Sequence, residues 1–338
     1  MRRHSTVGRV AVLGVALVVV AVAVVAVVAG VALAGGAART QDPPRPEFSP
    51  QAGVPGVVAS GSMIEAVKDG FQFLEGPNGT PDGGLYFSDL RASTMYRLDP
   101  SGTIRVAREK TNSANGMALM QDGSILSAEH DLRRVSRWQP SGTVTDFATH
   151  DGKGQQLLRP NDIVVDTKRG GVYFTDPGVF QQNKGRAYVH YVRPDGTLVM
   201  ISDELRTPNG LALTLDGKTL YVGDTEVPEV YAFDLRPDGS AVDTVPRVFA
   251  RLRNIDPPRG LSYADGMCMD TAGRLYVTST PGIQVFEKGG RHLGTIGIRR
   301  PSSCAFGGSE RRTLYITGGT TLYRIATLSQ GPNRPGNK

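Results

Sequence analysis

The chain has 338 residues, of which 39% are hydrophobic, and this composition supports a sizeable globular core while excluding a wholly disordered or fibrous protein. Its net charge of +6 is spread along the sequence without a dense Lys and Arg run interleaved with aromatic residues, so nucleic-acid binding has no support. Only two cysteines occur, Cys268 and Cys304, which excludes a disulfide framework and a thiolate zinc cluster.

The first 50 residues predict export. Three arginines before residue 10 precede an uncharged run, Val10–Ala34, which as a helix would be roughly 37 Å long, against about 30 Å for a bilayer core. Two interpretations stay open: a retained membrane anchor, which the length favours, or a cleaved signal peptide, since Ala32-Leu33-Ala34 resembles a signal-peptidase site. Both place the following domain outside the cytoplasm, because the arginines stay inside. A proline-rich stretch, 41–50, is then expected to form a stiff spacer.

A short strand pattern recurs six times after this segment, at intervals of 39 to 55 residues. Its copies are Leu85–Asp89, Ile125–Glu129, Val172–Asp176, Leu220–Asp224, Leu275–Ser279 and Leu314–Gly318. Each copy is followed by another aromatic-rich strand, and five of these run into a Gly-containing turn of the kind that tight hairpins need. Another apolar strand precedes each copy, so every unit is expected to be a four-stranded antiparallel meander. Six such units predict an all-β fold, a six-bladed β-propeller, preceded by an N-terminal hydrophobic helix.

The sixth unit is one strand short, because the chain ends soon after residues 322–327. The segment Val57–Val67 has no other partner in the repeat pattern and is predicted to supply the missing outer strand, which closes the ring. The predicted organisation is therefore a signal peptide or membrane anchor at 1–36, a linker at 37–56, the propeller at 57–327 and a disordered tail at 328–338. We expect a monomer with both cysteines as free, buried thiols, although one bridge stays open if the compartment is oxidising.

One residue in each unit lies 11 or 12 positions before the second residue of the repeated strand, where the innermost strand of that blade should start. These six start residues are Glu75, Asn115, Asn161, Asn209, Asp265 and Cys304. Because the innermost strands of a propeller line its central channel, the start residues should meet at one mouth of that channel. Five of them offer hard oxygen ligands, so Ca²⁺ is the expected divalent cation, with Zn²⁺, Mg²⁺ or Mn²⁺ by exchange. The alternative, that Asn or Asp before Gly only shapes a turn, explains one such residue better than it explains five.

Five short motifs surround these positions: Leu74-Glu75-Gly76-Pro77, Arg159-Pro160-Asn161-Asp162, Pro208-Asn209-Gly210-Leu211, Ala264-Asp265-Gly266-Met267 and Ser303-Cys304-Ala305-Phe306-Gly307-Gly308. In this order and spacing, the sequence from Val58 to Ile325 resembles the family of senescence marker protein 30, gluconolactonase and luciferin-regenerating enzyme. Glu129-His130 and the run Leu293-Gly294-Thr295-Ile296 are most similar to its bacterial gluconolactonase branch.

The resemblance implies roles for particular residues. It implies four ligands of one catalytic divalent cation: Glu75, Asn161, Asn209 and Asp265. By the same resemblance Asp265 would also act as the general base, Arg159 and Asn115 would contact the substrate, and Asp162 would support the ring of ligands. For His130 two interpretations stay open, a residue of the mouth that orients substrate and a loop histidine bonded to backbone.

The expected function is the metal-dependent hydrolysis of a sugar lactone, gluconolactone being the first candidate, or of a related small ester. The cation would polarise the lactone carbonyl while water, deprotonated by Asp265 or by the metal, attacks it. A serine-nucleophile route lacks support because the sequence contains no Gly-x-Ser-x-Gly elbow, and neither a P-loop nor a dinucleotide fingerprint occurs.

Two alternatives stay open. A non-catalytic propeller tethered at the membrane could bind a protein or a carbohydrate, because this fold hosts many functions. An arylesterase or organophosphate hydrolase could use the same metal. The related diisopropylfluorophosphatase-like propellers are thought to use a histidine on a late blade, whereas the only late histidine here, His292, falls in an outer-strand position. Asp89, Asp176 and Asp224 end equivalent strands and are expected to bond turn backbone.

Overall fold

This computed structural model describes residues 49–179, 186–255 and 264–334. The chain divides into two units, Met1–Pro44 and Arg45–Lys338, and all described residues belong to the second. The predicted hydrophobic helix and nearly all of the 41–50 spacer lie outside the described residues. Within those residues, no helix has the length and apolar character needed to cross a membrane.

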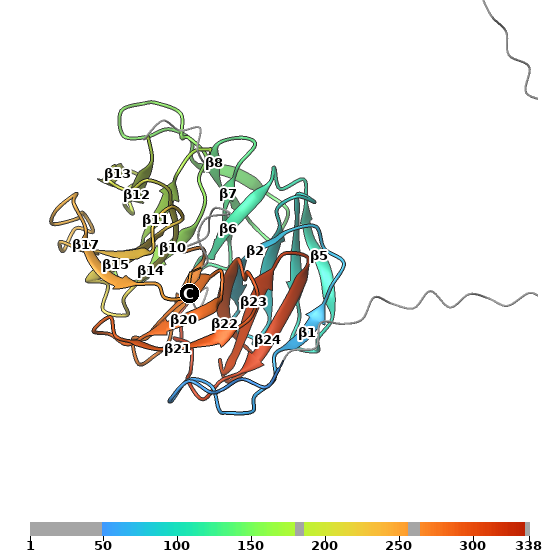
Figure 1. Cartoon of the computed structure of the whole chain (residues 1–338). Helices are drawn as coiled ribbons and strands as arrows, with labels where there is room; N and C mark the ends of the chain where they lie inside the picture. Colours follow the sequence, from blue (N-terminus) through green and yellow to red (C-terminus); the bar gives the residue numbers. More distant parts are fainter. Residues whose placement is uncertain (1–48, 180–185, 256–263, 335–338) are drawn as a thin grey trace, which may run out of the picture. The chain divides into compact units, whose positions relative to one another are not determined.

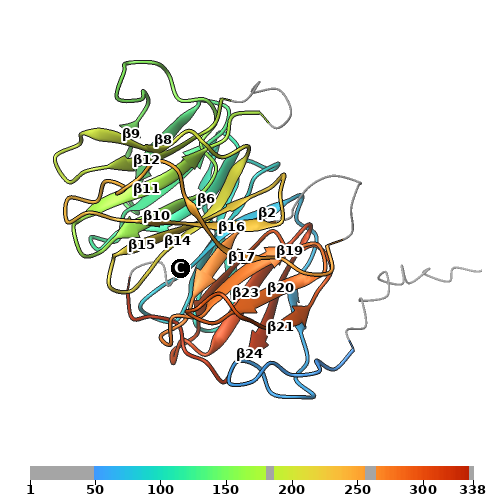
Figure 2. The ribbon, with the colours of Figure 1, turned by 60° about the vertical axis from the view of Figure 1, so that its left-hand side comes forward.

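The described residues form six four-stranded antiparallel sheets, which follow one another around a common centre (Figures 1 and 2). Each sheet is one blade, numbered here in chain order. Blade 1 consists of β2 (Leu74–Gly79), β3 (Leu85–Asp89), β4 (Thr94–Leu98) and β5 (Ile104–Glu109). Blade 2 consists of β6 (Ala114–Leu119), β7 (Ile125–Glu129), β8 (Arg134–Trp138) and β9 (Val144–Ala148). Blade 3 consists of β10 (Ile163–Asp166), β11 (Gly171–Asp176), β12 (Tyr188–Val192) and β13 (Leu198–Ser202).

The second half of the ring repeats this arrangement. Blade 4 consists of β14 (Pro208–Leu213), β15 (Thr219–Asp224), β16 (Glu229–Asp234) and β17 (Arg247–Arg251). Blade 5 consists of β18 (Met267–Met269), β19 (Leu275–Ser279), β20 (Gly282–Phe286) and β21 (His292–Gly297). Blade 6 consists of β22 (Ser303–Gly307), β23 (Thr313–Gly318), β24 (Thr321–Ala326) and β1 (Glu65–Lys68). The predicted six-bladed propeller with four-stranded blades is confirmed.

The first strand of the propeller closes its last blade. β1 pairs with β24 through Glu65 opposite Arg324 and Ala66 opposite Tyr323, and the two strands lie side by side in Figure 1. The Arg324 Nε atom is 2.8 Å from the Glu65 carboxylate across this pair. The predicted outer strand from segment 57–67 is therefore present, with its paired residues at the end of that segment.

The cores lie between neighbouring blades, because each sheet is apolar on both faces near the centre. The innermost strands β2 and β6 are buried along their whole length, whereas the outer strands β5 and β9 expose several side chains. Between blades 3 and 4, Tyr173 and Tyr191 stack with ring centroids 4.2 Å apart and pack with Leu211 and Phe233. Burying an aromatic or leucine side chain of this kind stabilises the fold by about 1.5–3 kcal/mol.

Residues just before β1 also belong to the propeller. Val54 and Val58 pair through backbone hydrogen bonds and are buried against blades 5 and 6. The Arg274 guanidinium donates to the Gly56 carbonyl oxygen at 2.6 Å. The boundary predicted at residue 57 is therefore too late, because residues 51–56 pack on the domain instead of extending from it.

The C-terminal segment packs in the same way. The Leu328 amide donates to the Val57 carbonyl at 2.8 Å, and the Gly331 amide donates to the Arg311 carbonyl at 2.8 Å. Arg334 donates through Nη2 to the carbonyl of Leu213, the last residue of an innermost strand, at 3.0 Å, and burial lowers the pKa of Arg334 to about 10. The tail predicted as disordered from residue 328 is thus ordered to Arg334, and residues 335–338 lie outside the described part of the chain.

Candidate functional site at the start of the innermost strands

The start residues predicted from the sequence stand on backbone segments that contact one another around a closed ring. A hydrogen bond joins each blade to the next at this level. In ring order these bonds are Ser88 Oγ to Asn115 O at 2.7 Å, Gly116 N to Asn161 O at 2.8 Å, Thr175 Oγ1 to Asn209 O at 2.8 Å, Thr225 Oγ1 to Ala264 O at 3.4 Å, Gly266 N to Ser302 O at 2.8 Å and Ser302 Oγ to Leu74 O at 2.7 Å. The backbone segments that carry Glu75, Asn115, Asn161, Asn209 and Asp265 therefore lie at one end of the innermost strands, around one centre. The sixth predicted position, Cys304, instead pairs with Ile316 inside β22 and packs in the core between blades 5 and 6, and Ser302 makes the contact to blade 1 in its place.

The glycine that follows a start residue permits this close approach. Gly76 follows Glu75 with φ of +49°, and a Cβ placed on it would lie 2.5 Å from the Asn115 carbonyl oxygen. A Cβ on Gly210, which follows Asn209, would overlap the carbonyl oxygen of Asp265. These glycines are needed because the backbones of neighbouring blades touch there, not merely to shape a turn.

A break in strand pairing sets the start residues apart from the sheet. Pairing shifts register between Glu75 and Asn78 on β2, and between Pro208 and Leu211 on β14. A bulge of this kind removes a residue from the ladder and re-aims its side chain, which is why bulges occur beside functional sites. Asn209 lies within such a bulge, and Glu75 lies at the edge of one.

Aspartates at the ends of three second strands hold the segments that lead into the start residues. The Asp176 carboxylate accepts the amides of Leu158 and Arg159 at 2.7 and 2.5 Å, just before Asn161. Asp89 accepts the amides of residues 72 and 73 at 2.8 and 3.0 Å, and Asp224 accepts those of residues 206 and 207 at 2.8 and 3.2 Å. The prediction that these aspartates bond backbone is confirmed. Burial raises the pKa of Asp224, while these backbone hydrogen bonds act in the opposite direction.

Hydroxyl side chains near these aspartates form contacts between blades that were not predicted from the sequence. Ser88 and Thr175 each precede the strand-ending aspartate and donate to the start-residue carbonyl of the next blade. Thr225 donates to the Ala264 carbonyl and accepts from Asn209 Nδ2 at 2.9 Å. This pair of bonds connects the Asn209 side chain through Thr225 to the backbone of blade 5. The sequence feature that could have predicted these contacts is a Ser or Thr next to the aspartate that ends the repeated strand.

The three predicted substrate-contact residues lie together beside the ring. Asn115 Nδ2 is 3.4 Å from His130 Nε2, and both side chains are buried. Burial first, and then the neighbouring Arg159 charge, lower the pKa of His130 to about 3, with the Pro160 backbone acting in the opposite direction. His130 is therefore neutral at pH 7, so its ring can accept a hydrogen bond from the Asn115 amide.

Blade 2 uses a glutamate where blades 1, 3 and 4 use aspartate. Glu129 is fully buried and accepts from Arg108 at 2.7 Å, from Arg134 at 2.8 Å and from Ser136 at 2.6 Å. The oxygen that accepts from Arg134 also accepts from Asn112 Nδ2 at 2.9 Å, in the loop that leads into Asn115. Blade 2 thus holds its start segment through a side chain rather than through backbone amides.

The predicted donor residues are of the chemical type that binds a hard divalent cation. Glu75 is 6% exposed, Asp162 is 4% exposed, and Asn161, Asn209 and Asp265 are half-buried. Asp162 accepts the Leu211 amide at 3.3 Å, which ties blade 3 to blade 4 behind the ring. Among the described residues no cluster of three or more His, Cys, Asp and Glu could hold a metal. The predicted set is of another kind, two carboxylates and two amide oxygens, which suits Ca²⁺ or Mg²⁺.

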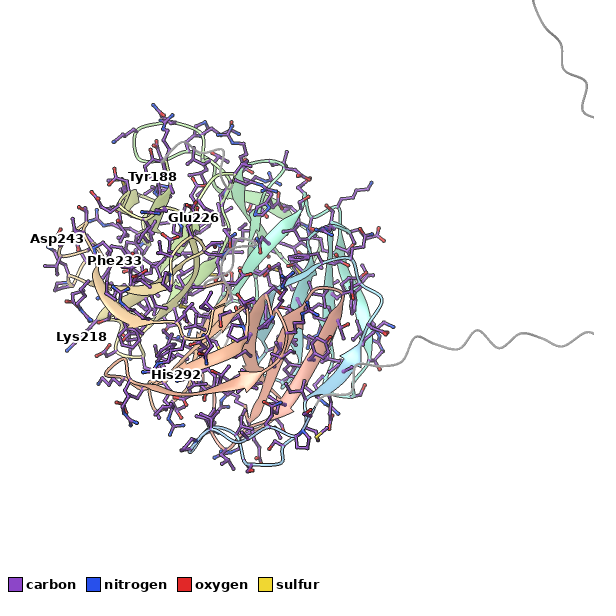
Figure 3. All side chains as sticks on the ribbon, in the orientation of Figure 1. Tyr188, Lys218, Glu226, Phe233, Asp243 and His292 are labelled. Carbon is purple, nitrogen blue, oxygen red and sulfur yellow. The ribbon has the colours of Figure 1, made fainter. Side chains whose placement is uncertain are left out.

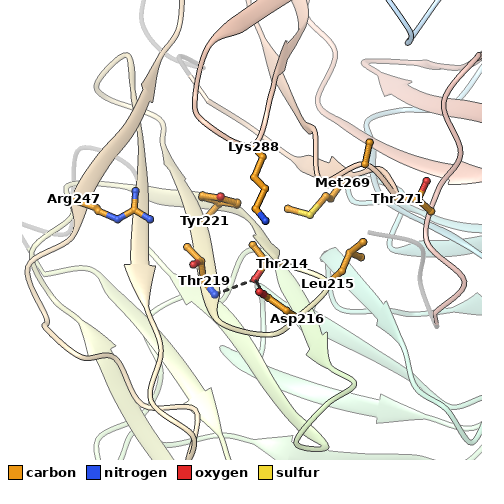
Figure 4. Close-up of a pocket in the computed structure, with 11 residues that line it drawn as sticks. Thr214, Leu215, Asp216, Thr219, Tyr221, Arg247, Met269, Thr271 and Lys288 are labelled. Atoms are coloured by element: carbon orange, nitrogen blue, oxygen red, sulfur yellow. Dashed lines mark hydrogen bonds between the residues drawn. The ribbon is translucent and has the colours of Figure 1, made fainter.

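Two other features lie away from this ring. A cleft of about 320 Å³ between blades 4 and 5 is lined by Thr214, Tyr221 and Lys288, beyond the opposite ends of the innermost strands (Figure 4). His292, labelled in Figure 3, begins the outer strand β21, where its Nε2 atom is 3.2 Å from Thr295 Oγ1. The predicted outer-strand position of His292 is confirmed.

Comparison with known proteins identifies similar chains. The sequence profile described as SMP-30/Gluconolactonase/LRE-like region matches residues 73–320. A gluconolactonase of Zymomonas mobilis is 30% identical, over 84% of this chain and 86% of that protein. The pentonolactonase XacC of Haloferax volcanii is 27% identical, over 72% and 80%. A solved gluconolactonase from Xanthomonas campestris has a TM-score of 0.72 and 29% identity, over 83% of this chain and 95% of that one.

Proposed function

Because the chain belongs to the SMP-30/gluconolactonase/LRE-like family, we propose that it is a lactonase that opens a sugar lactone, with gluconolactone as the first substrate to test. The observation that carries this proposal is the closed ring of start residues. Its hydrogen bonds join the backbone segments that carry Glu75, Asp265 and three asparagines, from successive blades, at one end of the innermost strands. Relatives named as gluconolactonase and pentonolactonase favour a lactone over the other ligands that a propeller can bind.

Four residues would hold the divalent cation, with Ca²⁺ the first choice: Glu75, Asn161, Asn209 and Asp265. When bound, the cation supplies a Lewis acid that polarises the lactone carbonyl and stabilises its oxyanion. Glu75 and Asp265 would balance the two positive charges, and Asn209 would bind through its amide oxygen, because its amide nitrogen donates to Thr225.

The proton path uses Asp265. Its carboxylate accepts a proton from the attacking water, whose oxygen bonds to the carbonyl carbon. The ring C–O bond then breaks and the alkoxide takes that proton back from Asp265, so the product is a hydroxy acid, which ionises at neutral pH. The Asp265 amide donates to the Thr278 carbonyl at 3.0 Å, which anchors the backbone of this half-buried aspartate.

The substrate would be oriented by Arg159, Asn115 and His130. The Arg159 guanidinium offers a forked set of donors for lactone hydroxyls or for the carbonyl oxygen. His130 stays neutral because burial, and then the neighbouring Arg159 charge, lower its pKa. A neutral ring and an amide are suited to hydroxyl-rich sugars, whose groups both donate and accept.

The test follows acid release from glucono-1,5-lactone by the full chain, with and without a chelator and with Ca²⁺ restored. Asp265→Asn and Glu75→Gln should each lower kcat/KM by two orders of magnitude or more, as expected when a general base or metal ligand is lost. Asp195→Asn, in an exposed turn of blade 3, is the matched control and should retain full activity. Chelator-independent rates, or unchanged rates in both variants across a panel of lactones and aryl esters, would contradict the proposal.

We also propose that residues 1–36 export the domain and hold it at a membrane unless they are cleaved. The support is the length of the run Val10–Ala34 and the three arginines before it. The mass of the mature chain distinguishes anchor from cleaved signal. Recovery of the intact chain in the cytoplasmic fraction would exclude both.

A further inference from the structure

Two thiols face each other across neighbouring blades. Cys268 on β18 and Cys304 on β22 have Sγ atoms 3.3 Å apart, and both side chains are fully buried. The structure holds both as thiols and not as a disulfide. These strands are the innermost strands of blades 5 and 6, so the pair lies in the core between these two blades, and Cys268 is three residues beyond Asp265.

The two strands are held in matching register. The Gly266 amide donates to the Ser302 carbonyl at 2.8 Å, and each of these residues lies two positions before a cysteine. Thr278 Oγ1 donates to both the Gly266 and the Ser302 carbonyls, at 2.8 and 3.0 Å. The strands therefore approach within hydrogen-bond distance just before the cysteines, which places the two thiols opposite each other.

The two sulfur atoms are close to bonding distance. A disulfide has an S–S length of about 2.05 Å, so the sulfur atoms need to approach by about 1.3 Å. The surrounding core contains Tyr276 and Phe306, whose rings meet edge-on at 5.2 Å. This packing excludes oxidants from the folded protein, so oxidation belongs to folding or to local opening.

We propose that Cys268 and Cys304 form a disulfide bond when the chain folds in an oxidising compartment. One thiolate attacks a disulfide oxidant, such as oxidised glutathione, to give a mixed disulfide and one glutathione thiolate. The second cysteine thiolate then displaces the other glutathione. The cysteines lose two protons and two electrons, and the oxidant becomes two thiols.

The bond adds a covalent link between blades 5 and 6 and is independent of the lactonase proposal. It closes a loop that runs from Cys268 through the three outer strands of blade 5 to Cys304. Closing a loop of that length reduces the conformational freedom of the unfolded chain. It also fixes β18 against β22 close to Asp265.

The test traps the thiols of the full chain with an alkylating reagent under denaturing conditions. Samples are equilibrated with oxidised or reduced glutathione in mild denaturant and then digested for peptide mapping. The oxidised sample should contain no alkylated cysteine and one linked Cys268–Cys304 peptide. Its melting temperature should exceed that of the reduced sample by roughly 5–10 °C.

Cys268→Ala and Cys304→Ala are matched controls, since each removes one sulfur from the same pair. Both variants should lose the linked peptide and the difference in melting temperature between oxidised and reduced samples. Alkylation of both cysteines in the oxidised wild-type chain would overturn the proposal. Linkage only between two chains, or a melting temperature that does not depend on the redox state, would also overturn it.

Discussion

Blades 2 and 3 carry a carboxylate at the same place, the end of the second strand, yet the two carboxylates bind different partners. Asp176 in blade 3 accepts two backbone amides of the segment that leads into Asn161. Glu129 in blade 2 is one methylene longer and accepts from the Arg108 and Arg134 guanidinium groups and from the Asn112 side chain. The comparison teaches that a propeller can keep one start position in place by two means, a backbone clamp or a buried ionic network.

The largest expected effect comes from removing the network in blade 2. Glu129→Ala would leave the Arg108 guanidinium, 7% exposed, without its carboxylate partner. Breaking a buried pair in this way costs about 3–5 kcal/mol, measured by denaturant unfolding. Asp146→Ala, which removes only the exposed partner of Arg134, is the control and should have little effect. Equal losses of unfolding free energy in Glu129→Ala and Asp146→Ala would mean that burial does not determine how much an ion pair contributes here.

Weakening the Asp176 contacts in blade 3 should lower the free energy of unfolding less than removing Glu129 does, but should lower lactonase activity more. Asp176→Asn replaces a charged acceptor of two amides by one with a single oxygen, at about 2–3 kcal/mol of unfolding free energy. Because Arg159 and Asn161 lie on the clamped segment, kcat/KM for a lactone should fall at least tenfold at a temperature where the variant is folded. Full activity in Asp176→Asn would show that the clamp does not position the site.

A third expectation concerns pH and the histidine that follows Glu129. His130 has a pKa near 6.5 when unfolded and about 3 when folded, so the unfolded chain binds the proton first as the pH falls. The contribution of neutral His130 to the free energy of unfolding is therefore fully present above pH 6.5 and is lost progressively down to about pH 3. About 2 kcal/mol of it should be lost between pH 7.5 and pH 5. His130→Gln should remove this component of the pH dependence, whereas His150→Gln, at an exposed position, should not. An unchanged pH profile in His130→Gln would contradict the assignment.

The smallest effects are expected where blades 1 and 2 are alike. At the opposite ends of their strands, Asp82 pairs with Arg97 and Asp122 pairs with Arg137, all partly exposed. Asp82→Ala and Asp122→Ala should each cost below about 1 kcal/mol and should leave lactonase activity unchanged. A much larger loss in one of them would mean that the two blades differ at this end as well.

The fold could be predicted from the sequence because each blade is encoded by a continuous, repeated pattern of strands and turns. The repeated second strands are apolar and aromatic because they are buried between blades, as Tyr173 and Tyr276 are. The start residues were predicted by counting from those strands, and the backbone segments of all of them except Cys304 lie around one centre. Contacts between blades could not be predicted in the same way, since a sequence contains no register between one sheet and the next. The Ser88 and Thr175 hydroxyls, the partners of Glu129 and the packing of residues 328–334 all depend on that register.

The pairing of β1 with β24 also determines when the ring can close during synthesis. β1 is made first and stays without a partner until Arg324 and its neighbours have left the ribosome. Five blades can fold in order as they emerge, but blade 6 must wait for the end of the chain. A translation product that stops short of β24 would therefore have two open sheet edges and would be a natural substrate for proteases.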